Sequence, residues 1–513
     1  MKVKNPIIKG FYADPSICYA KGKFYLICST MHYFPGVPIF ESEDLIHWKQ
    51  IGNALSRPSQ VELDKINSSG GVFAPTIRYN NGRFYMVTTN DTYHKNFYIY
   101  TDDIYGEWSE PIFVDQGGID PSLFFENGKT YFISNGSDSN GRGCVFQCEI
   151  DIETGERLTP SMPIWNGNGG RYLESPHMYK FGNYYYLMAA EGGTEYGHMV
   201  TVSRSASITG PFNTYKNNPI LSNKDLGGHE SHIQGIGHAD LVTNADGETF
   251  MVCLGFRIQS DWMPFHQLGR EVFLVPITWD GEWFRAGVEG HVYDEMEINV
   301  DKMYKSDAEM MDYNFKMPFK STDYHRMSYI RCPVNSNYDI KDDKISLTPT
   351  TITLDDVDTP TFLGVRQSEF NTEFSAKFSG AIGEAGLTAI MDEKHHYEIA
   401  RVIEENGEGF VFARFHVGSA IGLTKSIPIK KNDEITLKII STNANYSFFA
   451  IINGEEKLLG EADSQHLSSE VAGGFTGVYE GVYSSAKLIK GIDDYKEIKN
   501  AETVEITELA FIQ

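Results

Sequence analysis

The sequence has no apolar run long enough to cross a membrane. A membrane-spanning helix needs about 20 consecutive apolar residues, and no segment of the 513 residues approaches this length. The opening residues, MKVKNPIIKGFYADPS, carry three lysines but lack the apolar core of a signal peptide. We therefore expect a cytoplasmic protein with no membrane partner.

Cysteine is scarce, and its pattern excludes the common metal sites. No C-x-x-C pair and no His/Cys cluster at zinc spacing occurs. We predict free, buried thiols, because free cysteine packs as a small hydrophobe. The segment GGHESHIQG places His229 and His232 around Glu230, but without a third ligand beside the two histidines we predict no metal there. The six cysteines are Cys18, Cys28, Cys144, Cys148, Cys253 and Cys332.

Positive charge is also in short supply. Asp and Glu number 69 against 44 Lys and Arg, which gives a formal net charge of −25. Such a chain repels nucleic acid and anionic surfaces, so neutral or cationic partners fit better. With 41% hydrophobic residues the chain is a folded one, and its length exceeds what a single core organises. We expect two domains.

Helical periodicity is nearly absent, and a hairpin-like unit recurs instead. Each copy has a short apolar run, a glycine-containing turn and a second, aromatic-rich run, which is typical of a β-hairpin. Further strand-like runs and tryptophan-containing turns, such as SEDLIHW and DDIYGEW, leave room for about four strands per unit. The copies are DPSICYAKGKFYL from Asp14, APTIRYNNGRFYM from Ala74, DPSLFFENGKTYF from Asp120, SPHMYKFGNYYYL from Ser175 and, more loosely, HADLVTNADGETFM from His238.

Five β-rich repeats predict a five-bladed β-propeller over residues 1–300. A solenoid fits less well, because the helical period is missing. In a propeller the innermost strand of each blade starts near the central channel, so the heads of the repeats converge on one pocket. Three heads supply acids, namely Asp14, Asp120 and Glu174, while the fifth supplies His238 and the second only Ala74.

Turn formation offers another explanation of these acids, since Asp-Pro favours turns. It does not explain why a Glu replaces Asp with a one-residue offset in the fourth repeat. Carboxylates gathered in one pocket shift each other's pKa values apart, so that one serves as an acid and another as a base. Hydrolysis of a glycosidic bond needs this division of roles.

The motifs of this half resemble glycoside hydrolase family 43, in its branch of β-xylosidases and α-L-arabinofuranosidases. The likeness covers the whole predicted propeller, with the motifs in order. They are NPIIKGFYADPSI, FPGVPIFESEDLIHW, GIDPSLFF, YLESPHMY, AEGGTEYGH, IGHADLV and LGREVFLVP.

The resemblance implies an inverting mechanism and a role for each acid. Asp14 resembles the general base that deprotonates water, Glu174 the general acid, and Asp120 the third acid, which orients the general acid and raises its pKa. An inverting enzyme holds its acid and base roughly 6.5 to 9.5 Å apart to admit the water. No cofactor is required, although a central calcium ion near His238 is kept as an option.

The resemblance also implies residues that bind the sugar. Arg270 resembles an arginine at the pocket floor, whose guanidinium donates several hydrogen bonds; a surface arginine is the alternative. His238 is placed on the channel axis, beside the base or holding an ion through water, unless it is a core histidine. Phe34 and Phe73 stand where aromatic walls are expected. Tyr33 and Phe73 replace tryptophans that are frequent in relatives, which weakens any statement about the preferred pentose.

From about residue 320 the texture changes. Alternating runs such as EITLKII, YSFFAII and VEITELAFI predict a β-sandwich. We therefore predict an all-β chain, with a propeller at 1–300, a linker at 301–320 and a lectin-like sandwich at 321–513. Relatives use a loop of this domain to close the active-site mouth, and in GGFTGVYEG Phe475 is the candidate; a buried strand aromatic is the alternative.

The sequence thus predicts an inverting exo-glycosidase that removes terminal β-D-xylose from xylo-oligosaccharides. An α-L-arabinofuranosidase, or an enzyme with both activities, is the alternative, and a homo-oligomer is an option. A propeller lectin that binds sugar without cleaving it is a rival of another class, but a lectin does not need three acids. The retaining fructosidase propellers fit less well, because ADPSI does not match their NDPNG-like motif.

Overall fold

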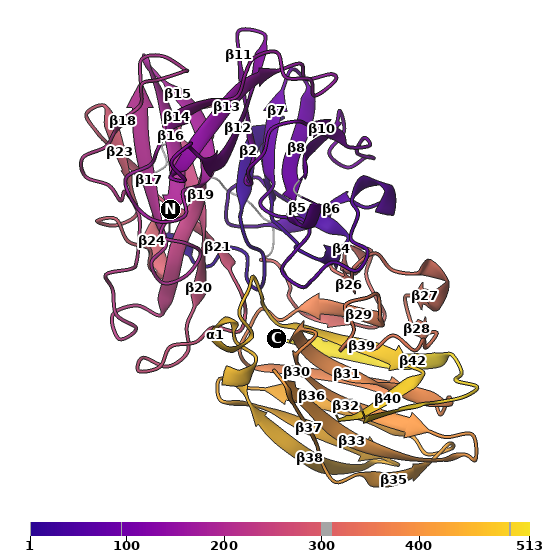
Figure 1. The fold of residues 1–513 in the computed structure, drawn as a ribbon. Coiled ribbons are helices and arrows are strands. Elements are labelled where there is room, and N and C mark those ends of the chain that lie inside the picture. Colours follow the sequence, from indigo (N-terminus) through magenta and orange to yellow (C-terminus); the bar gives the residue numbers. More distant parts are fainter. Residues whose placement is uncertain (1, 94, 299–309, 492–493) are drawn as a thin grey trace.

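The computed structural model describes residues 2–93, 95–298, 310–491 and 494–513. In these residues the only α-helix is the four-residue α1 (Ser469–Ala472), and nearly all other regular structure is β-strand. No helix in the described part of the chain is long and apolar enough to span a bilayer. Figure 1 shows a propeller in contact with a sandwich, with α1 at their junction. The predicted all-β fold, a five-bladed propeller followed by a β-sandwich, is confirmed.

The first two blades are antiparallel four-stranded sheets. The first contains β2 (Ser16–Ala20), β3 (Lys23–Ile27), β5 (Gly36–Ser42) and β6 (Lys49–Leu55). The second contains β7 (Thr76–Asn80), β8 (Arg83–Asn90), β9 (Lys95–Thr101) and β10 (Ile112–Val114).

The third and fourth blades have the same form. The third contains β11 (Ser122–Glu126), β12 (Lys129–Ser137), β13 (Gly143–Ile150) and β14 (Met162–Trp165). The fourth contains β15 (Glu174–Phe181), β16 (Tyr184–Glu191), β17 (Met199–Ser205) and β18 (Asn213–Thr214).

The fifth blade joins the two ends of the propeller. The backbone of Ile7 and Ile8 hydrogen-bonds to Val272 at the edge of its three-stranded sheet, so the start of the chain lies beside the last repeat. The sheet contains β19 (Ile233–Thr243), β20 (Thr249–Arg257) and β21 (Glu271–Val275). Two small pairs flank it, β1 (Lys2–Lys4) with β24 (Glu295–Glu297) and β22 (Ile277–Asp280) with β23 (Trp283–Ala286).

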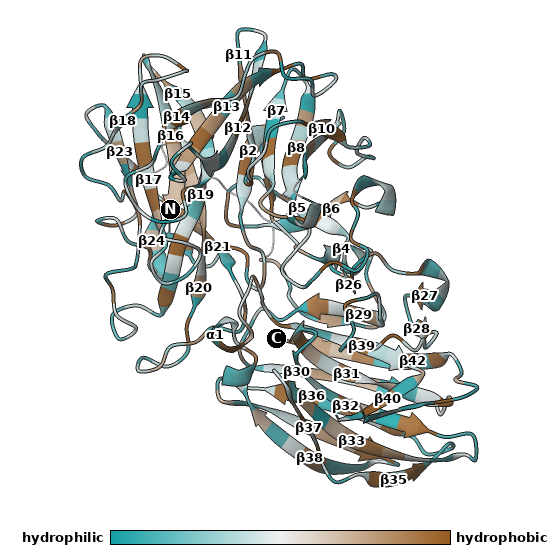
Figure 2. Ribbon diagram, viewed as in Figure 1, coloured by the Kyte–Doolittle hydropathy of each residue, from teal (hydrophilic) through white to brown (hydrophobic). Residues whose placement is uncertain are grey.

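The sandwich stacks two antiparallel sheets over an apolar core. Alternate residues of β36 are buried, as expected for a strand with one face on the core, and Figure 2 shows hydrophobic residues along the strands of both domains. One sheet contains β25 (Phe315–Lys316), β27 (Tyr338–Lys341), β28 (Lys344–Leu347), β30 (Thr372–Phe378), β36 (Ile435–Ser441), β37 (Asn445–Ile452), β38 (Glu455–Asp463) and β42 (Val504–Ile512). The other contains β29 (Thr361–Arg366), β31 (Gly383–Asp392), β32 (His395–Ile403), β33 (Glu408–Val417), β34 (Ala420–Leu423), β35 (Ile427–Lys430) and β39 (Tyr479–Ser485), with the hairpin β40 (Lys487–Gly491) and β41 (Asp494–Glu497) nearby.

The two domains share an apolar cluster and a strand pair. β4 (Tyr33–Phe34) of the propeller half pairs with β26 (Tyr329–Ile330) of the sandwich half. Of the predicted linker, residues 301–309 lie outside the described residues, while β25 belongs to the sandwich sheet through its pairing with β42. The domain boundaries themselves stay a prediction.

Candidate active site

The heads of four blades share an unusual backbone conformation. Asp14, Asp120, Ser175 and His238 have φ values of 55°, 53°, 54° and 42°, a left-handed region that non-glycine residues rarely adopt. Such residues cost free energy and cluster at functional sites. Asp14 and Asp120 precede β2 and β11, Ser175 follows the first residue of β15, and His238 lies within β19. In the fourth blade it is Ser175, and not the acid Glu174, that takes the backbone conformation of Asp14 and Asp120. The one-residue offset of Glu174 in the sequence is therefore also present in the structure.

Asp14 is buried among donors. Its Oδ2 accepts a hydrogen bond from Ser29 Oγ at 2.7 Å, and its Oδ1 lies 3.0 Å from Nη1 of Arg270 and 3.4 Å from Nδ1 of His238. Burial raises the pKa of Asp14, but Arg270, His238 and Ser29 together bring it below its ordinary value. This carboxyl group is thus held ionised, as a base must be.

The other two acids are shifted in the opposite direction. Burial, together with the negative charge of Asp14, raises the pKa of Glu174 to about 7, although Arg270 opposes the shift. Burial and the charges of Glu174 and Asp14 raise the pKa of Asp120 well above its usual range. Asp120 Oδ2 accepts a hydrogen bond from the backbone N–H of Ser175 at 3.0 Å, so it fixes the residue next to Glu174. Glu174 is half-buried, and with a pKa of about 7 its carboxyl group keeps its proton up to near neutral pH.

Arg270 is held at the base of the pocket. Its Nη1 donates to Thr194 Oγ1 at 3.1 Å as well as to Asp14. The preceding residue, Gly269, has a φ of +78°, and a Cβ there would lie 2.6 Å from Phe11, so only glycine fits. Nη2 of Arg270 is buried and has no hydrogen-bond partner among the described residues. A sugar hydroxyl is a suitable acceptor for that free donor.

A loop of the sandwich covers this arginine. The Phe475 ring centroid lies 5.0 Å from the Arg270 guanidinium carbon, and the ring meets Phe73 edge-on at 5.5 Å. The backbone N–H of Phe475 donates to Ser69 Oγ of the propeller at 2.8 Å. Arg270 and Phe475 line a pocket of about 200 Å³, together with Thr194, Glu195, Tyr196, Phe256, His266, Ser469, Glu470, Gly474 and Thr476.

Comparison with known proteins agrees with this geometry. Residues 3–284 match the family described as glycosyl hydrolases family 43, and residues 320–493 match the β-xylosidase C-terminal concanavalin A-like domain. The chain belongs to glycoside hydrolase family 43. It is an enzyme that hydrolyses glycosidic bonds.

Three relatives illustrate the breadth of the match. The non-reducing end α-L-arabinofuranosidase BoGH43B of Bacteroides ovatus is 38% identical over 494 residues, which cover 94% of this chain and 91% of that protein. A xylosidase/arabinosidase of Butyrivibrio fibrisolvens is 36% identical over 510 residues, with coverage of 94% and 95%. The crystal structure of a xylan β-1,4-xylosidase from Bacillus halodurans C-125 superposes with a TM-score of 0.89 at 25% identity and covers 100% of both chains.

Not every predicted wall residue of this family 43 enzyme reaches the pocket. Phe34 is 5% exposed and packs in the core of the first two blades with Val37 and Tyr329. Consecutive residues of a strand point to opposite faces, so in β4 Tyr33 takes the side that faces the sandwich and stacks on Tyr479 at 3.7 Å. The prediction that Phe34 lines the sugar pocket is therefore not supported by its position.

Beneath His238 the propeller channel contains a network that sequence reasoning missed. Arg78 contacts both carboxylate oxygens of Asp240 at 2.8 and 3.0 Å and donates to His177 Nδ1 at 2.9 Å. Tyr179 donates to Asp240 Oδ1 at 2.6 Å. Arg78 lies in the repeat motif APTIRY and Asp240 in HADL. A charged residue in a strand that is otherwise expected to be buried could have indicated that each needs a partner of opposite charge.

This network bears on the predicted calcium ion. Calcium prefers six to eight oxygen ligands. The carboxylates that act on His238 are Asp14 and Asp240, and each is already paired with an arginine. The side-chain oxygens here do not fit a directly held calcium, so an ion held through water by His238 stays a prediction, and we derive no step through it.

The histidine segment GGHESHIQG also has a partner. His232 pairs with Asp294 at 3.0 Å.

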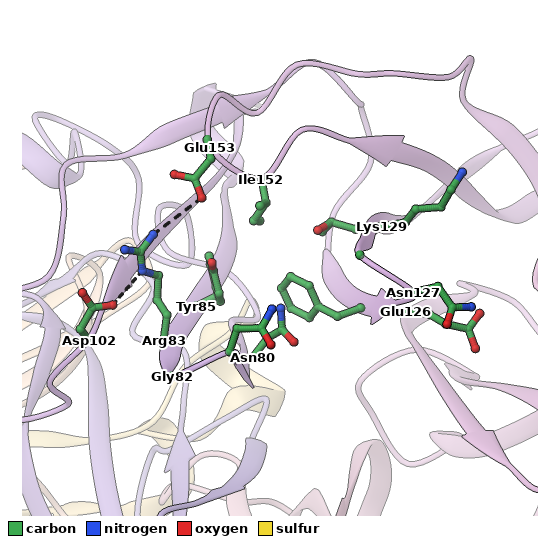
Figure 3. Close-up of a pocket in the computed structure, with 14 residues that line it drawn as sticks. Asn80, Gly82, Arg83, Tyr85, Asp102, Glu126, Asn127, Lys129, Ile152 and Glu153 are labelled. Carbon is green, nitrogen blue, oxygen red and sulfur yellow. Dashed lines mark hydrogen bonds and ion pairs between the residues drawn. The ribbon is translucent and has the colours of Figure 1, made fainter.

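A larger cleft, of about 710 Å³, lies away from these acids. It is formed by the hairpin turns of the second and third blades, at the ends of β7 and β11 opposite the repeat heads. Figure 3 shows Arg83 bridging Asp102 and Glu153 along one side of it. Neither the three acids nor Arg270 lines it, whereas Arg270, the partner of Asp14, lines the smaller pocket, so this cleft is not the active site.

Proposed function

We propose that this family 43 hydrolase is an inverting exo-enzyme that removes terminal β-D-xylose from xylo-oligosaccharides, as in xylan degradation. Removal of terminal α-L-arabinofuranose, or both activities in one pocket, is the alternative. The names of the relatives support both, since one is an arabinofuranosidase, one a xylosidase/arabinosidase and one a xylosidase. The single observation that carries the proposal is the opposite shift of the pKa values of Asp14 and Glu174.

The two shifts support the roles proposed for Asp14 and Glu174 in the proton transfers. Asp14, held ionised by Arg270 and Ser29, takes a proton from water while the water oxygen attacks the anomeric carbon. Glu174, protonated near neutral pH, gives its proton to the departing glycosidic oxygen. The products are a pentose with inverted anomeric configuration and an oligosaccharide that is one sugar shorter. Asp14 then loses its proton to solvent and Glu174 takes one up. Asp120 acts through the Ser175 backbone as a positioning residue.

The sandwich loop supports exo action. Phe475 lies against Arg270 and Phe73, so the pocket narrows at the junction of the two domains. A pocket of about 200 Å³ suits one sugar ring better than a long chain. The free Nη2 of Arg270 supplies a donor for a hydroxyl of that ring.

The test is hydrolysis of 4-nitrophenyl β-D-xylopyranoside and α-L-arabinofuranoside by the wild type, with Asp14→Ala and Glu174→Ala as folded controls. We expect turnover of at least one substrate, loss of that turnover in both variants, and α-xylose as the first product of the β-xyloside by proton NMR. Initial release of β-xylose contradicts inversion. Binding of xylose without turnover of either substrate favours the sugar-binding alternative.

The sequence expectations of a cytoplasmic location and of a homo-oligomer stay predictions. Cell fractionation tests the first and light scattering tests the second.

A further inference from the structure

Two histidines and an aspartate meet in the sandwich, outside the active site. His396 in β32 and His416 in β33 are directly opposite in register, so their side chains lie on the same face of the sheet. Asp355 comes from the loop between β28 and β29. Both histidines are buried, and Asp355 is half-buried. Among the described residues these three form the one group whose metal-ligating atoms lie within 4.8 Å of one another.

The three ligand atoms form a small triangle. Asp355 Oδ1 lies 2.6 Å from His416 Nδ1 and 3.0 Å from His396 Nε2, and the two ring nitrogens are 3.1 Å apart. Ligand atoms placed tetrahedrally at about 2.0–2.1 Å from zinc lie about 3.3 Å from one another. The triangle is therefore close to the size of one face of such a site.

The contacts of His416 exceed what one imidazole proton can satisfy. Its Nε2 is 3.2 Å from the carbonyl oxygen of Gly418, and its Nδ1 is 2.6 Å from Asp355 Oδ1. A carbonyl and a carboxylate oxygen only accept hydrogen bonds, and a ring with one N–H can donate to only one of them. A metal ion bound at Nδ1 and Asp355 Oδ1 leaves the single N–H on Nε2 for Gly418, so that every contact of the ring is satisfied.

His396 is arranged in the same way. Its Nδ1 lies 3.1 Å from Glu398 Oε1, and its Nε2 faces the other two ligand atoms. A carboxylate on the outer nitrogen of a metal-binding histidine is a common supporting contact.

We propose that Asp355, His396 and His416 bind a divalent transition-metal ion, with zinc as the ion that the donor set and its spacing suit best. Two imidazole nitrogens and one carboxylate oxygen are ligands typical of zinc, and a water molecule completes four-coordination on the partly exposed side of Asp355. The residue after it, Asp356, holds the loop by accepting hydrogen bonds from the backbone N–H and the hydroxyl of Thr353, at 2.8 and 2.9 Å.

The position of the site indicates a structural role. In the sheet, His396 is opposite Ile390, and Ile390 is opposite Tyr479, the residue that stacks on Tyr33 of the propeller. A bound ion would therefore join the Asp355 loop to the row of residues that contacts the catalytic domain. It takes no part in the proton transfers at Asp14 and Glu174.

The experiment uses the full-length protein, freed of metal by a chelator and then titrated with zinc chloride. We expect one zinc ion per chain by calorimetry and elemental analysis, a higher melting temperature with zinc, and with Co²⁺ the strong visible absorption of a tetrahedral site. Asp355→Asn, which keeps the side-chain volume, should weaken zinc binding at least tenfold. Asp356→Asn is the matched control, because it removes the same charge from the same loop, keeps a side-chain oxygen that accepts from Thr353, and leaves the three ligands; it should bind zinc like the wild type.

Three results would overturn the proposal. They are no zinc binding by the wild type, equal affinity of Asp355→Asn and wild type, and zinc binding that is lost in Glu174→Ala, which would place the ion in the active site. In the first case, NMR detection of hydrogens on both ring nitrogens of His416 would show that a second proton, and not a metal ion, satisfies the contact with Asp355.

Discussion

The guanidinium carbon of Arg270 lies 5.0 Å from the ring centroid of Phe475, so the catalytic propeller and the sandwich meet over the ion pair of the proposed base. The same arginine contacts Asp14 at 3.0 Å. One residue thus connects the charge state of the base with the loop that narrows the pocket. The activity of the propeller should therefore depend on the sandwich.

Replacing Phe475 should weaken substrate binding. In Phe475→Ala the cation–π contact and one pocket wall are lost, and an interaction of about 1 kcal/mol corresponds to about a fivefold fall in kcat/KM. We expect most of the change in KM, measured with the better 4-nitrophenyl glycoside. Val471→Ala, at an exposed site in the nearby α1, serves as control. Equal kinetics of Phe475→Ala and wild type would show that the ring does not reach the sugar.

The pH profile of kcat/KM should be bell-shaped. The proposed acid, Glu174, must be protonated, so activity should fall as the pH rises through about 7. The proposed base, Asp14, must be ionised, and because its pKa is lowered, activity should persist down to pH values below the ordinary range of aspartate. In Glu174→Gln the alkaline limb should vanish along with most activity on poor leaving groups. A profile that stays flat through pH 7 to 9 would contradict the acid assignment.

Glu174 should also destabilise the fold at neutral pH. Its pKa is raised from 4.5 to about 7 by folding, so the folded state binds more protons than the unfolded state between these values. Stability from this group is therefore greatest below about pH 4.5 and falls as the pH rises to about 7. In Glu174→Gln no carboxyl group titrates at this position. The melting temperature of Glu174→Gln minus that of wild type should grow from pH 4.5 to 7 and then level off, and a difference that is constant over this range would refute the shift.

The channel network should be important for stability. Arg78→Met leaves Asp240 buried without its counter-ion, and breaking a buried pair in this way costs about 3–5 kcal/mol of unfolding free energy. Urea denaturation measures the loss.

Arg83→Met is the matched control for this experiment. Arg83 makes a 2.8 Å pair with Asp102, whose side chain is 73% exposed, and such surface pairs contribute little. We expect little change in the urea midpoint. Similar losses of unfolding free energy in both arginine variants would show that the buried pair does not stabilise the fold more than the surface pair does.

The three acids that we propose as catalytic could be singled out from the sequence because they occur in local, repeated motifs. The hairpin signature recurs five times, and its heads carry Asp14, Asp120 and Glu174 in positions that any propeller brings to one channel. Even the one-residue offset of Glu174 was visible in the sequence, and the structure explains it, since Ser175 takes the left-handed conformation that the aspartates take in their own repeats.

Other features depend on contacts between distant segments, which no local pattern encodes. Phe34 looked like a wall residue, but the orientation of β4 turns Tyr33 toward the sandwich and Phe34 into the core. Arg78 and Asp240 are separated by most of the propeller, and their pairing appears only when the blades close into a ring. The same holds for Asp355, which reaches two histidines of neighbouring strands.

By itself, the sequence determined the all-β character, the number of blades and the three acids, because alternation, turn residues and repeats act over short distances along the chain. Only the tertiary structure decided which carboxyl group is held ionised and which keeps its proton. That choice depends on burial and on nearby charges such as Arg270, which lies 256 residues from Asp14 in the chain but 3.0 Å away in space.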